Sequence, residues 1–405
     1  MQAPQMKPVR VVLAAGGTGG HVYPALAVAE ELRRLRPNAR LLFIGGDRME
    51  AQVVPAAGYR FRRISVHGLA GRGLTRLARR TRAALELLLG IPLWQSLGAL
   101  RGFRPNVVIG TGGYASGPVL LAAHLMHIPS LALEGNRTAG RTSRAAAKMV
   151  DVMAVAWPEL EAYFSDRVRK STRVVLTGLP VRPELLQVGR SEGATTLGLD
   201  PVRRTLLVLG GSLGSRPINE ALVGAIRLIA GRGGFGEVQV VHATGRSAAA
   251  ARSARADRGR GHGDSAQSVV RLTASEVEAI APGYRAIPYL EADYGAALAV
   301  ADLVVARAGA STVAELTARG LPAILIPWSQ AAAGEQTENA EPVAKVGGAT
   351  VIPDAELTPE RLAQALVQIL WDDERRARMA TASKLLGRPK AAEEVARLAL
   401  ELGER

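Results

Sequence analysis

The amino-acid sequence predicts an α/β protein with two doubly wound, Rossmann-like domains, and three observations lead to this fold class. Short apolar runs typical of buried strands alternate with helical stretches along the 405-residue chain, as in a parallel sheet covered by helices on both faces. The segment Thr177–Pro183 interrupts this alternation with two prolines and one glycine, a composition typical of a linker. The alternation then restarts with a strand, a glycine-rich loop and a helix, so the second half begins as the first does.

The first half contains a series of predicted strands. They span residues 9–14, 41–45, 107–110, 130–133 and 151–155. The first strand leads into Ala15–His21, a loop with four glycines. We expect the next helix to begin near Pro24, because proline suits a first helical turn. The predicted first domain covers residues 1–178.

The second half, a predicted domain of residues 179–384, repeats the pattern. Its predicted strands span residues 205–209, 286–290, 302–306 and 322–327. The loop Gly210–Gly214 precedes a helix expected from about Pro217. Residues 245–268 are rich in Arg, Ala, Ser and Gly without apolar periodicity, which is typical of a mobile surface insertion. A Thr-Pro pair that suits a cap and first turn predicts that the tail from Thr358 to Arg405 is helical.

Composition limits the classes of function. The absence of cysteine excludes disulfides, thiolate metal sites and cysteine catalysis. The start of the chain lacks the apolar core of a signal peptide, and no apolar run reaches the roughly 18–20 residues that cross a bilayer, so we expect a soluble cytoplasmic protein. The formal charge of +15 indicates an anionic partner (phosphorylated metabolite, anionic lipid or nucleic acid) or simply an arginine-rich surface. The aromatic content of 4% argues against a base-stacking surface.

The loop Ala15–His21 is the strongest local signal. Side chains are nearly absent from it, so its backbone N–H groups can approach an anion closely, with the dipole of the next helix behind them. His21 adds a titratable imidazole at the end of the loop. The structural alternative, a plain strand-to-helix turn, needs one glycine and no histidine.

Two further glycine loops favour phosphate-bearing ligands but leave two reactions open. None of the three loops matches a Walker A loop. Gly110–Ala115 fits G-x-G-x-x-A after a strand, and Glu134 lies about where a ribose-binding carboxylate is expected, so a nicotinamide-dependent oxidoreductase is one hypothesis. The other is an enzyme with a pyrophosphate-bearing donor and a second phosphorylated substrate, which would use all three loops.

Polar residues near two helix starts of the second half also have two interpretations. Thr312 and Glu315 have the spacing of a capping box, but Glu315 is equally suited to accept hydrogen bonds from a ribose diol. Gln336 and Asn339 share one helix face, where they either bind sugar hydroxyls or remain solvated.

Taken together, the motifs resemble the MurG family, enzymes of glycosyltransferase family 28 with the two-domain GT-B fold. The similar segments run in the family's order from Gly16 to about Gly348: GGTGGHVYPALAVAEEL, GTGGYASGP, EGNRTAGRTSRAAAK, GLPVRPE, GGSLGSRPIN, RAGASTVAELTARGLPAILIP and EQTENA. The resemblance implies two Rossmann-like domains facing a central cleft. The first would bind the acceptor and the membrane, with a helix of about residues 385–405 packed back on it, and the second would bind the UDP-sugar.

The resemblance also implies the reaction. An inverting N-acetylglucosaminyltransferase would move N-acetylglucosamine from UDP-N-acetylglucosamine to the C4 hydroxyl of lipid I (undecaprenyl-pyrophosphoryl-MurNAc-pentapeptide). The product, lipid II, serves peptidoglycan synthesis and thereby cell shape and division. His21 matches the residue proposed as the catalytic base.

The remaining site residues follow from the same motifs. Ser212 would face the donor phosphates, Leu290 would border the uracil, and Glu315 would help to hold the ribose. The full set of expected donor-binding residues is Thr18, Gly19, Gly20, Asn136, Arg182, Ser212, Leu290, Ala310, Ser311, Thr312, Glu315, Gln336 and Asn339. The residues expected to hold the acceptor diphosphate are Gly16, Gly17, Gly112, Gly113, Tyr114 and Ser116.

Three positions depart from the family's pattern. Leu133 and Leu213 bear on how the diphosphates and the hinge are held, and Glu335 bears on the sugar contacts. The chain also contains no Asp-x-Asp pair suited to Mg²⁺–UDP, so we expect no cofactor and no obligatory metal. Loop N–H groups and helix dipoles would take over the stabilisation of the departing UDP.

A lipid-linked acceptor predicts a membrane-facing patch. Residues 72–104 interleave arginines with leucines, which favours an anionic surface, although an ordinary amphipathic helix packed on its own domain has the same pattern. The expected patch consists of Arg72, Leu74, Arg76, Leu77, Arg79, Arg80, Leu88 and Trp94. We therefore expect a peripheral enzyme at the cytoplasmic face of the cell membrane whose partners are UDP-N-acetylglucosamine, lipid I, the anionic membrane surface and proteins of cell-wall synthesis, but not nucleic acid.

Other functions remain open from the sequence. The same fold could glycosylate another lipid such as diacylglycerol, or a secondary metabolite. The oxidoreductase hypothesis rests on Gly110–Ala115 and Glu134, and a nucleic-acid-binding module would rest on the arginine-rich insertion.

Overall fold

The chain forms two compact units in a computed structural model. The structure describes residues 8–66, 90–211, 214–231, 234–245, 281–331 and 334–404. The first unit combines Met1–Pro183 with Arg388–Arg405, and the second is Glu184–Gly387. The change from one unit to the other therefore falls at the end of the Pro/Gly-rich linker.

The first unit is built on a parallel sheet, with seven strands among the described residues. In spatial order they are β3 (Arg60–Arg63), β2 (Arg40–Gly45), β1 (Arg10–Ala14), β4 (Val107–Gly110), β5 (Ser130–Glu134), β6 (Val152–Val155) and β7 (Arg173–Leu176). The helices are α1 (Gly19–Leu35), α2 (Glu50–Ala56), α4 (Ile91–Phe103), α5 (Ser116–Leu125), α6 (Arg141–Ala146), α7 (Pro158–Ser165) and α18 (Ala391–Gly403). β1 pairs with both β2 and β4, so the strand order reverses there and the loops after β1 and β4 are neighbours at the carboxyl edge.

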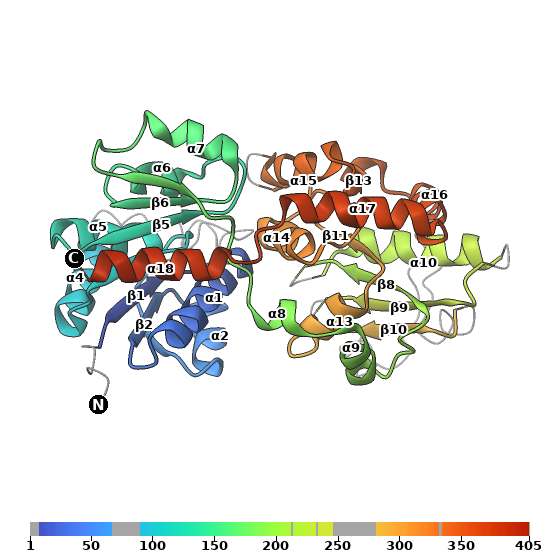
Figure 1. Ribbon diagram of the computed structural model, residues 1–405, viewed down its shortest axis with the longest axis horizontal. Helices are drawn as coiled ribbons and strands as arrows, with labels where there is room; N and C mark the ends of the chain where they lie inside the picture. The colour runs from blue at the N-terminus through green and yellow to red at the C-terminus, as the bar shows by residue number, and fades with distance from the viewer. Residues whose placement is uncertain are drawn as a thin grey trace, which may run out of the picture. The chain divides into compact units, whose positions relative to one another are not determined.

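The second unit repeats this plan with six described strands. Their spatial order is β10 (Tyr284–Ile287), β9 (Val238–Ala243), β8 (Arg204–Leu209), β11 (Leu303–Ala306), β12 (Ala323–Leu325) and β13 (Ala349–Val351). The helices are α8 (Glu184–Gln187), α9 (Arg190–Leu197), α10 (Arg216–Ala230), α13 (Tyr294–Val300), α14 (Ala310–Arg319), α15 (Glu335–Lys345), α16 (Pro359–Leu370) and α17 (Asp373–Leu386). The predicted fold class, two doubly wound parallel α/β domains, is confirmed (Figure 1).

The start of α1 corrects the sequence-based expectation. The helix begins at Gly19, with Thr18 in an extended N-cap conformation, so Pro24 lies inside it rather than in its first turn. A proline at this point removes the N–H that would donate to the carbonyl of Gly20, and its ring crowds that carbonyl, although its fixed φ suits a helix. The loop is therefore shorter than predicted, and His21 belongs to the first turn of α1.

Four strands escaped prediction. β3 reads Arg-Phe-Arg-Arg, and β7 and β13 are likewise edge strands, so their sequences are less apolar than those of central strands. β9 is central, but buried Gln239 and His242 interrupt its apolar run. β10 begins two residues before the predicted start at residue 286.

Helix α18 belongs to the first unit although it follows the whole second unit in sequence. It packs along α1 and also contacts β4 and β5, and Figure 1 shows it in red beside α1. Its buried face includes Val395, Ala399 and Leu402. Ion pairs from Arg36 to Glu404 (2.6 Å) and from Arg173 to Glu401 (3.0 Å) connect this end of the chain to the unit.

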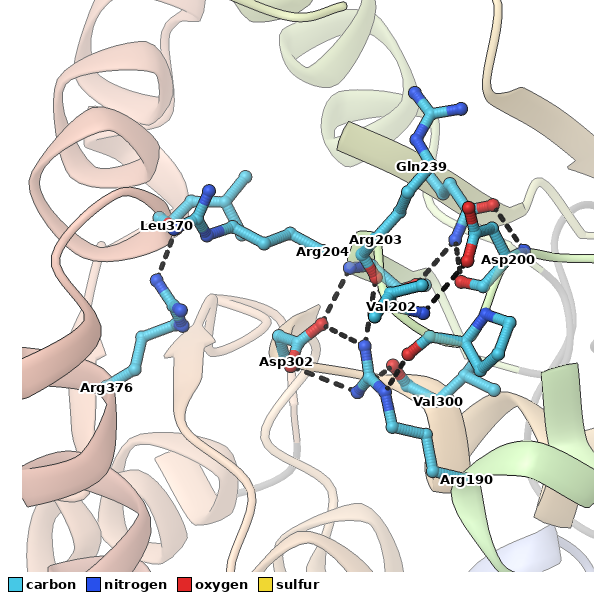
Figure 2. A network of polar contacts seen from close by, with 12 residues as sticks. Arg190, Asp200, Val202, Arg203, Arg204, Gln239, Val300, Asp302, Leu370 and Arg376 are labelled. Carbon is cyan, nitrogen blue, oxygen red and sulfur yellow. Dashed lines mark hydrogen bonds and ion pairs between the residues drawn. The ribbon is translucent and has the colours of Figure 1, made fainter. Parts of the chain in front are cut away.

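The amino-terminal edge of the second sheet is held by Arg190 (Figure 2). Its guanidinium donates five hydrogen bonds: to both carboxylate oxygens of Asp302 (3.0 and 2.9 Å) and to the carbonyls of Pro201, Val300 and Arg203 (2.7, 2.9 and 2.9 Å). Asp302 also accepts the backbone N–H of Thr205 at 2.8 Å. All five guanidinium donors are thus used to join α9 to the starts of β8 and β11.

Two sequence predictions fall largely outside the described part of the chain. The expected membrane patch lies there except for Trp94 on α4, and the arginine-rich insertion lies there except for Gly245. None of the described helices has an apolar stretch long enough to cross a bilayer.

Candidate functional site

The loop after β1 presents backbone donors. Gly17 has a φ of +98°, which L side chains rarely adopt. The side chain of Thr18 makes no capping hydrogen bond to α1. The N–H groups of Gly19 and Gly20, at the positive end of the helix dipole, consequently have no acceptor within the helix. This is the geometry of an anion-binding helix start.

The loop after β4 is in direct contact with this first loop. A Cβ added to Gly112 would lie 2.5 Å from Nδ1 of His21, and one added to Gly113 would overlap the carbonyl of Gly16. Both glycines also have positive φ, +102° and +79°. Glycine is thus required at Gly112 and Gly113 for the two loops to form one surface.

His21 is oriented by Thr111, which follows β4. Its Nδ1 lies 3.1 Å from the Thr111 carbonyl oxygen, while the Thr111 hydroxyl donates to the His21 carbonyl at 2.8 Å. Since a carbonyl only accepts, Nδ1 carries the proton and the lone pair lies on Nε2.

Burial keeps the His21 imidazole neutral. It lowers the pKa of His21, and the charge of Glu134, the hydrogen bond to Thr111 and the charge of Glu50 oppose this only in part. A neutral imidazole with a fixed tautomer and an unprotonated Nε2 has the form of a general base.

Glu50, which sequence reasoning missed, braces the first loop. This buried residue begins α2 and accepts hydrogen bonds from the backbone N–H groups of Gly46 (2.9 Å) and Gly17 (3.1 Å). The only sequence signal is a carboxylate a few residues beyond the Gly-Gly pair at the end of the second strand. Arg48 and Tyr114 line a small pocket with Glu50 and the first loop.

Glu134 does not fit the ribose-binding role of the oxidoreductase hypothesis. The side chain is buried, and its two oxygens accept from the backbone N–H groups of Asn136 (2.9 Å) and Gly140 (2.8 Å). Both oxygens therefore support the loop between β5 and α6. That interpretation of Gly110–Ala115 is wrong in this respect.

The other predicted residues of the first unit differ in how accessible they are. Tyr114 is half exposed next to Gly17. The guanidinium of Arg182 lies 4.7 Å from the ring centre of Tyr23, a cation–π contact within the unit. Ser116 is buried; its hydroxyl lies 2.7 Å from the carbonyl oxygens of both Ala14 and Gly112 and accepts the backbone N–H of Gly112 at 3.1 Å, so its side chain braces the loops.

The start of α14 is the corresponding place in the second unit. Since β11 pairs with β8, the loops after these two strands are neighbours at the point where the strand order reverses. Gly309 is the N-cap, so Thr312 and Glu315 lie inside the helix and do not form the capping box considered above. Glu315 is only 8% exposed, and its Oε2 accepts a hydrogen bond from the hydroxyl of Tyr294 at 2.6 Å.

Ser311 contributes a buried hydroxyl to the same face of α14. It precedes Glu315 by four residues, one helical turn, so the two side chains share a face. The Oγ of Ser311 is buried and has no hydrogen-bond partner within the described residues. A buried hydroxyl without a partner is costly, which is consistent with a ligand that supplies one.

Gln336 and Asn339 on α15 are both hydrogen-bonded. The Oε1 of Gln336 accepts the backbone N–H of Trp328 at 2.9 Å, which leaves its amide NH₂ to donate. Asn339 is fully buried, and its Nδ2 is 3.4 Å from the Ala308 carbonyl. Asn339 is therefore not the solvated residue of the alternative interpretation.

Arg307, also missed by sequence reasoning, connects the loop after β11 to the loop after β8. It pairs with Asp354 at 2.6 Å and donates to the hydroxyl of Ser215, the N-cap of α10, at 2.8 Å.

Leu290, a predicted donor-binding residue, is buried just after β10. Ser212 lies outside the described residues.

Comparisons with known proteins place these observations in a family. The model of the glycosyltransferase family 28 N-terminal domain matches residues 11–155, and that of the C-terminal domain matches residues 205–395. Both matches include the glycine loops described above.

Curated relatives match over nearly their full length. A Desulforudis audaxviator protein named UDP-N-acetylglucosamine--N-acetylmuramyl-(pentapeptide) pyrophosphoryl-undecaprenol N-acetylglucosamine transferase is 40% identical, with 96% of each chain covered. A Desulfitobacterium hafniense protein of the same name is also 40% identical, with 97% of this chain and 99% of the relative covered. The crystal structure of Acinetobacter baumannii MurG has a TM-score of 0.68 at 26% identity and covers 97% of this chain and all of its own.

Proposed function

Because the chain belongs to glycosyltransferase family 28, we propose that it transfers N-acetylglucosamine from UDP-N-acetylglucosamine to the C4 hydroxyl of lipid I. The product is lipid II, a precursor of peptidoglycan. The observation that carries the proposal is His21, a neutral imidazole with an unprotonated Nε2 beside two glycine loops.

The chemistry is a direct displacement. Nε2 of His21 accepts the proton of the acceptor C4 hydroxyl as that oxygen attacks the anomeric carbon of the donor. The bond from this carbon to the UDP oxygen breaks, UDP leaves with the electron pair, and the α-linked sugar becomes β-linked. Loop N–H groups and helix dipoles stabilise the charge on the departing UDP. We propose no cofactor and no obligatory metal.

The donor is assigned mainly to the second unit. The start of α14 supports this assignment, because the buried Ser311 hydroxyl and the Glu315 carboxylate share a face suited to a nucleoside. The amide NH₂ of Gln336, for which the described residues provide no acceptor, suits a sugar hydroxyl. The proposed donor contacts are Thr18, Gly19, Gly20, Asn136, Arg182, Ser212, Leu290, Ala310, Ser311, Thr312, Glu315, Gln336 and Asn339.

The acceptor diphosphate is assigned to the paired loops of the first unit. The positive-φ glycines of these loops and the direct contact between the loops support this assignment. The proposed contacts are Gly16, Gly17, Gly112, Gly113, Tyr114 and Ser116, the last through its main chain, since its hydroxyl is already used.

We propose that the protein acts peripherally on the cytoplasmic face of the cell membrane, where its acceptor is anchored. Trp94, on α4, supports this because it is 66% exposed, which is unusual for a large apolar side chain. The rest of the proposed patch, Arg72 to Leu88, rests on sequence alone. Anionic lipid and cell-wall synthesis proteins are its proposed partners there.

A transfer assay with UDP-N-acetylglucosamine and a soluble lipid I analogue tests the function. We expect UDP release that depends on both substrates and a β-linked disaccharide product. Transfer to a diacylglycerol acceptor instead, or no transfer with any lipid I analogue, contradicts the proposal.

A further inference from the structure

The loop after β2 ends beside the two glycine loops of the first unit. Because β1 pairs with β2 on one side and with β4 on the other, the loops that follow these three strands share the carboxyl edge of the sheet. Arg48 belongs to the loop after β2 and lines a small pocket together with Gly16, Gly17 and Tyr114. Sequence reasoning gave Arg48 no role. The structure thus adds a cation to the place where the acceptor diphosphate is proposed to bind.

The backbone around Arg48 is held on both sides. Gly46, two residues earlier, donates its N–H to Glu50 at 2.9 Å, and the same carboxylate accepts the N–H of Gly17 at 3.1 Å. The carbonyl of Arg48 accepts the N–H of Ala51 in the first turn of α2 at 3.1 Å. Glu50 therefore ties the loop that carries Arg48 to the glycine loop after β1.

The guanidinium of Arg48 has no acceptor in the part of the chain that the structure describes. The residue is partly buried, yet its side chain makes no hydrogen bond or ion pair with another described residue. Glu50, which lines the same pocket, instead accepts the two backbone N–H groups. Since a guanidinium carries five donors and is always charged, partial burial without an acceptor costs free energy. An anionic ligand in the pocket would supply the acceptors.

The charges of the pocket also favour a cation at this position. Backbone N–H groups and the dipole of α1 provide only partial positive charges for a diphosphate. The buried Glu50 carboxylate places a full negative charge behind the same loop. Arg48 offsets that charge, and its planar fork matches the geometry of phosphate oxygens.

We infer that Arg48 is an acceptor-binding residue whose guanidinium donates hydrogen bonds to the diphosphate of the lipid-linked substrate. This inference rests on the proposed function, because it requires that diphosphate at the glycine loops of the first unit. Loss of the guanidinium should raise the KM for the acceptor. The kcat and the donor KM should change little, because the group takes part neither in the proton transfer to His21 nor in nucleotide binding.

A purely structural role makes a different prediction. If Arg48 only supports its loop, its loss lowers the melting temperature, and restoring the charge alone does not restore activity. If Arg48 binds the diphosphate, the melting temperature of the unliganded protein should hold, because no described hydrogen bond is lost. A lysine at this position should then recover part of the affinity.

Transfer kinetics of the full chain with the soluble lipid I analogue measure these effects. We expect Arg48→Gln to raise the acceptor KM at least about tenfold, with kcat and the donor KM within about twofold of the unaltered values. Arg48→Lys keeps the charge without the fork, so its KM should lie between the two. The matched control is Arg40→Gln, which removes an exposed arginine at the opposite end of β2 and should leave all three parameters unchanged.

Inorganic pyrophosphate distinguishes the diphosphate from the other anionic groups of the acceptor. With UDP-N-acetylglucosamine at saturation, pyrophosphate should inhibit transfer in competition with the lipid I analogue. Arg48→Gln should raise its inhibition constant at least about fivefold, and Arg40→Gln should not change it.

The outcomes separate the inference from the proposed function. The inference is wrong if Arg48→Gln leaves the acceptor KM or the inhibition constant unchanged, or if pyrophosphate does not compete with the acceptor. A lower melting temperature without recovery in Arg48→Lys also contradicts it, and in each of these cases the proposed function stands. Failure of the unaltered protein to transfer to the lipid I analogue overturns both.

Discussion

Replacing His21 with alanine removes the proposed general base and should lower kcat by at least about 100-fold. A positioned base contributes about 10²–10⁴-fold, equivalent to roughly 3–5 kcal/mol of activation free energy. The structure supports a value in this range because Thr111 fixes the tautomer and burial keeps the ring neutral. The donor KM should change little, since the ring's hydrogen bond is to the protein rather than to the nucleotide.

The pH profile provides an independent measure of the same group. His21 acts as a base only when it is neutral, and its pKa is lowered by burial, so kcat/KM should fall in acid with a midpoint below the ordinary histidine value of 6.5. The acid limb should be absent from whatever activity His21→Ala retains.

The free energy of unfolding should also depend on pH through His21, and it should decrease in acid as the activity does. Because the folded-state pKa of His21 lies below the unfolded value of 6.5, the unfolded chain binds more protons between these two values. The free energy of unfolding should therefore decrease as pH falls from 6.5 towards the folded-state pKa. This contribution should disappear in His21→Ala.

The assay is UDP release with the soluble lipid I analogue from pH 5 to 9, with urea unfolding over the same range. His124→Ala, at the end of α5, is a control that removes a histidine outside the site. Turnover of His21→Ala within about threefold of the unaltered protein, or an acid limb centred above pH 7, would refute the assignment of the base.

Four further changes test other parts of the site and fold. Gly113→Ala forces a Cβ into the facing loop and should raise the KM for the acceptor at least tenfold in the transfer assay, whereas Gly102→Ala, with open space around it, should be neutral or slightly stabilising. Ser311→Ala removes a buried hydroxyl with no described partner, so the melting temperature of the unliganded protein should hold or rise while calorimetry shows UDP binding weakened roughly fivefold; a lower melting temperature with unchanged affinity contradicts this. Arg190→Ala should destabilise the second unit by about 1–2 kcal/mol in thermal unfolding, and an unchanged transition would show that its five hydrogen bonds add nothing. Trp94→Ala should reduce co-sedimentation with anionic vesicles roughly threefold or more, and unchanged binding would remove it from the proposed patch.

The sequence predicted those features that depend on local pattern. Central strands such as β1 and β4 are continuous apolar runs, and glycine loops follow them, so the fold class and the loops around His21 could be predicted. Edge strand β3, with three arginines in four residues, carries no such pattern, because its sequence need not be apolar on both faces.

Contacts between distant segments could not be predicted. The carbonyl that fixes the His21 tautomer belongs to Thr111, 90 residues away, and becomes its neighbour only because β1 pairs with β4. Glu50 and Arg307 were missed for the same reason, since each acts on a loop that the chain reaches through the sheet. Glu134 shows the opposite case, in which a suitable spacing suggested a ligand contact but both oxygens bind the backbone.

The way α18 completes the first unit has a consequence for biosynthesis. During translation, residues 184–387 are synthesised in full before the segment that covers α1. The first unit therefore cannot be completed until synthesis ends, and the apolar face of α1 that packs on α18 stays uncovered until then. If residues 1–183 were expressed alone, this apolar face would stay uncovered. A usable fragment of the first unit should therefore carry residues 388–405 on a short linker.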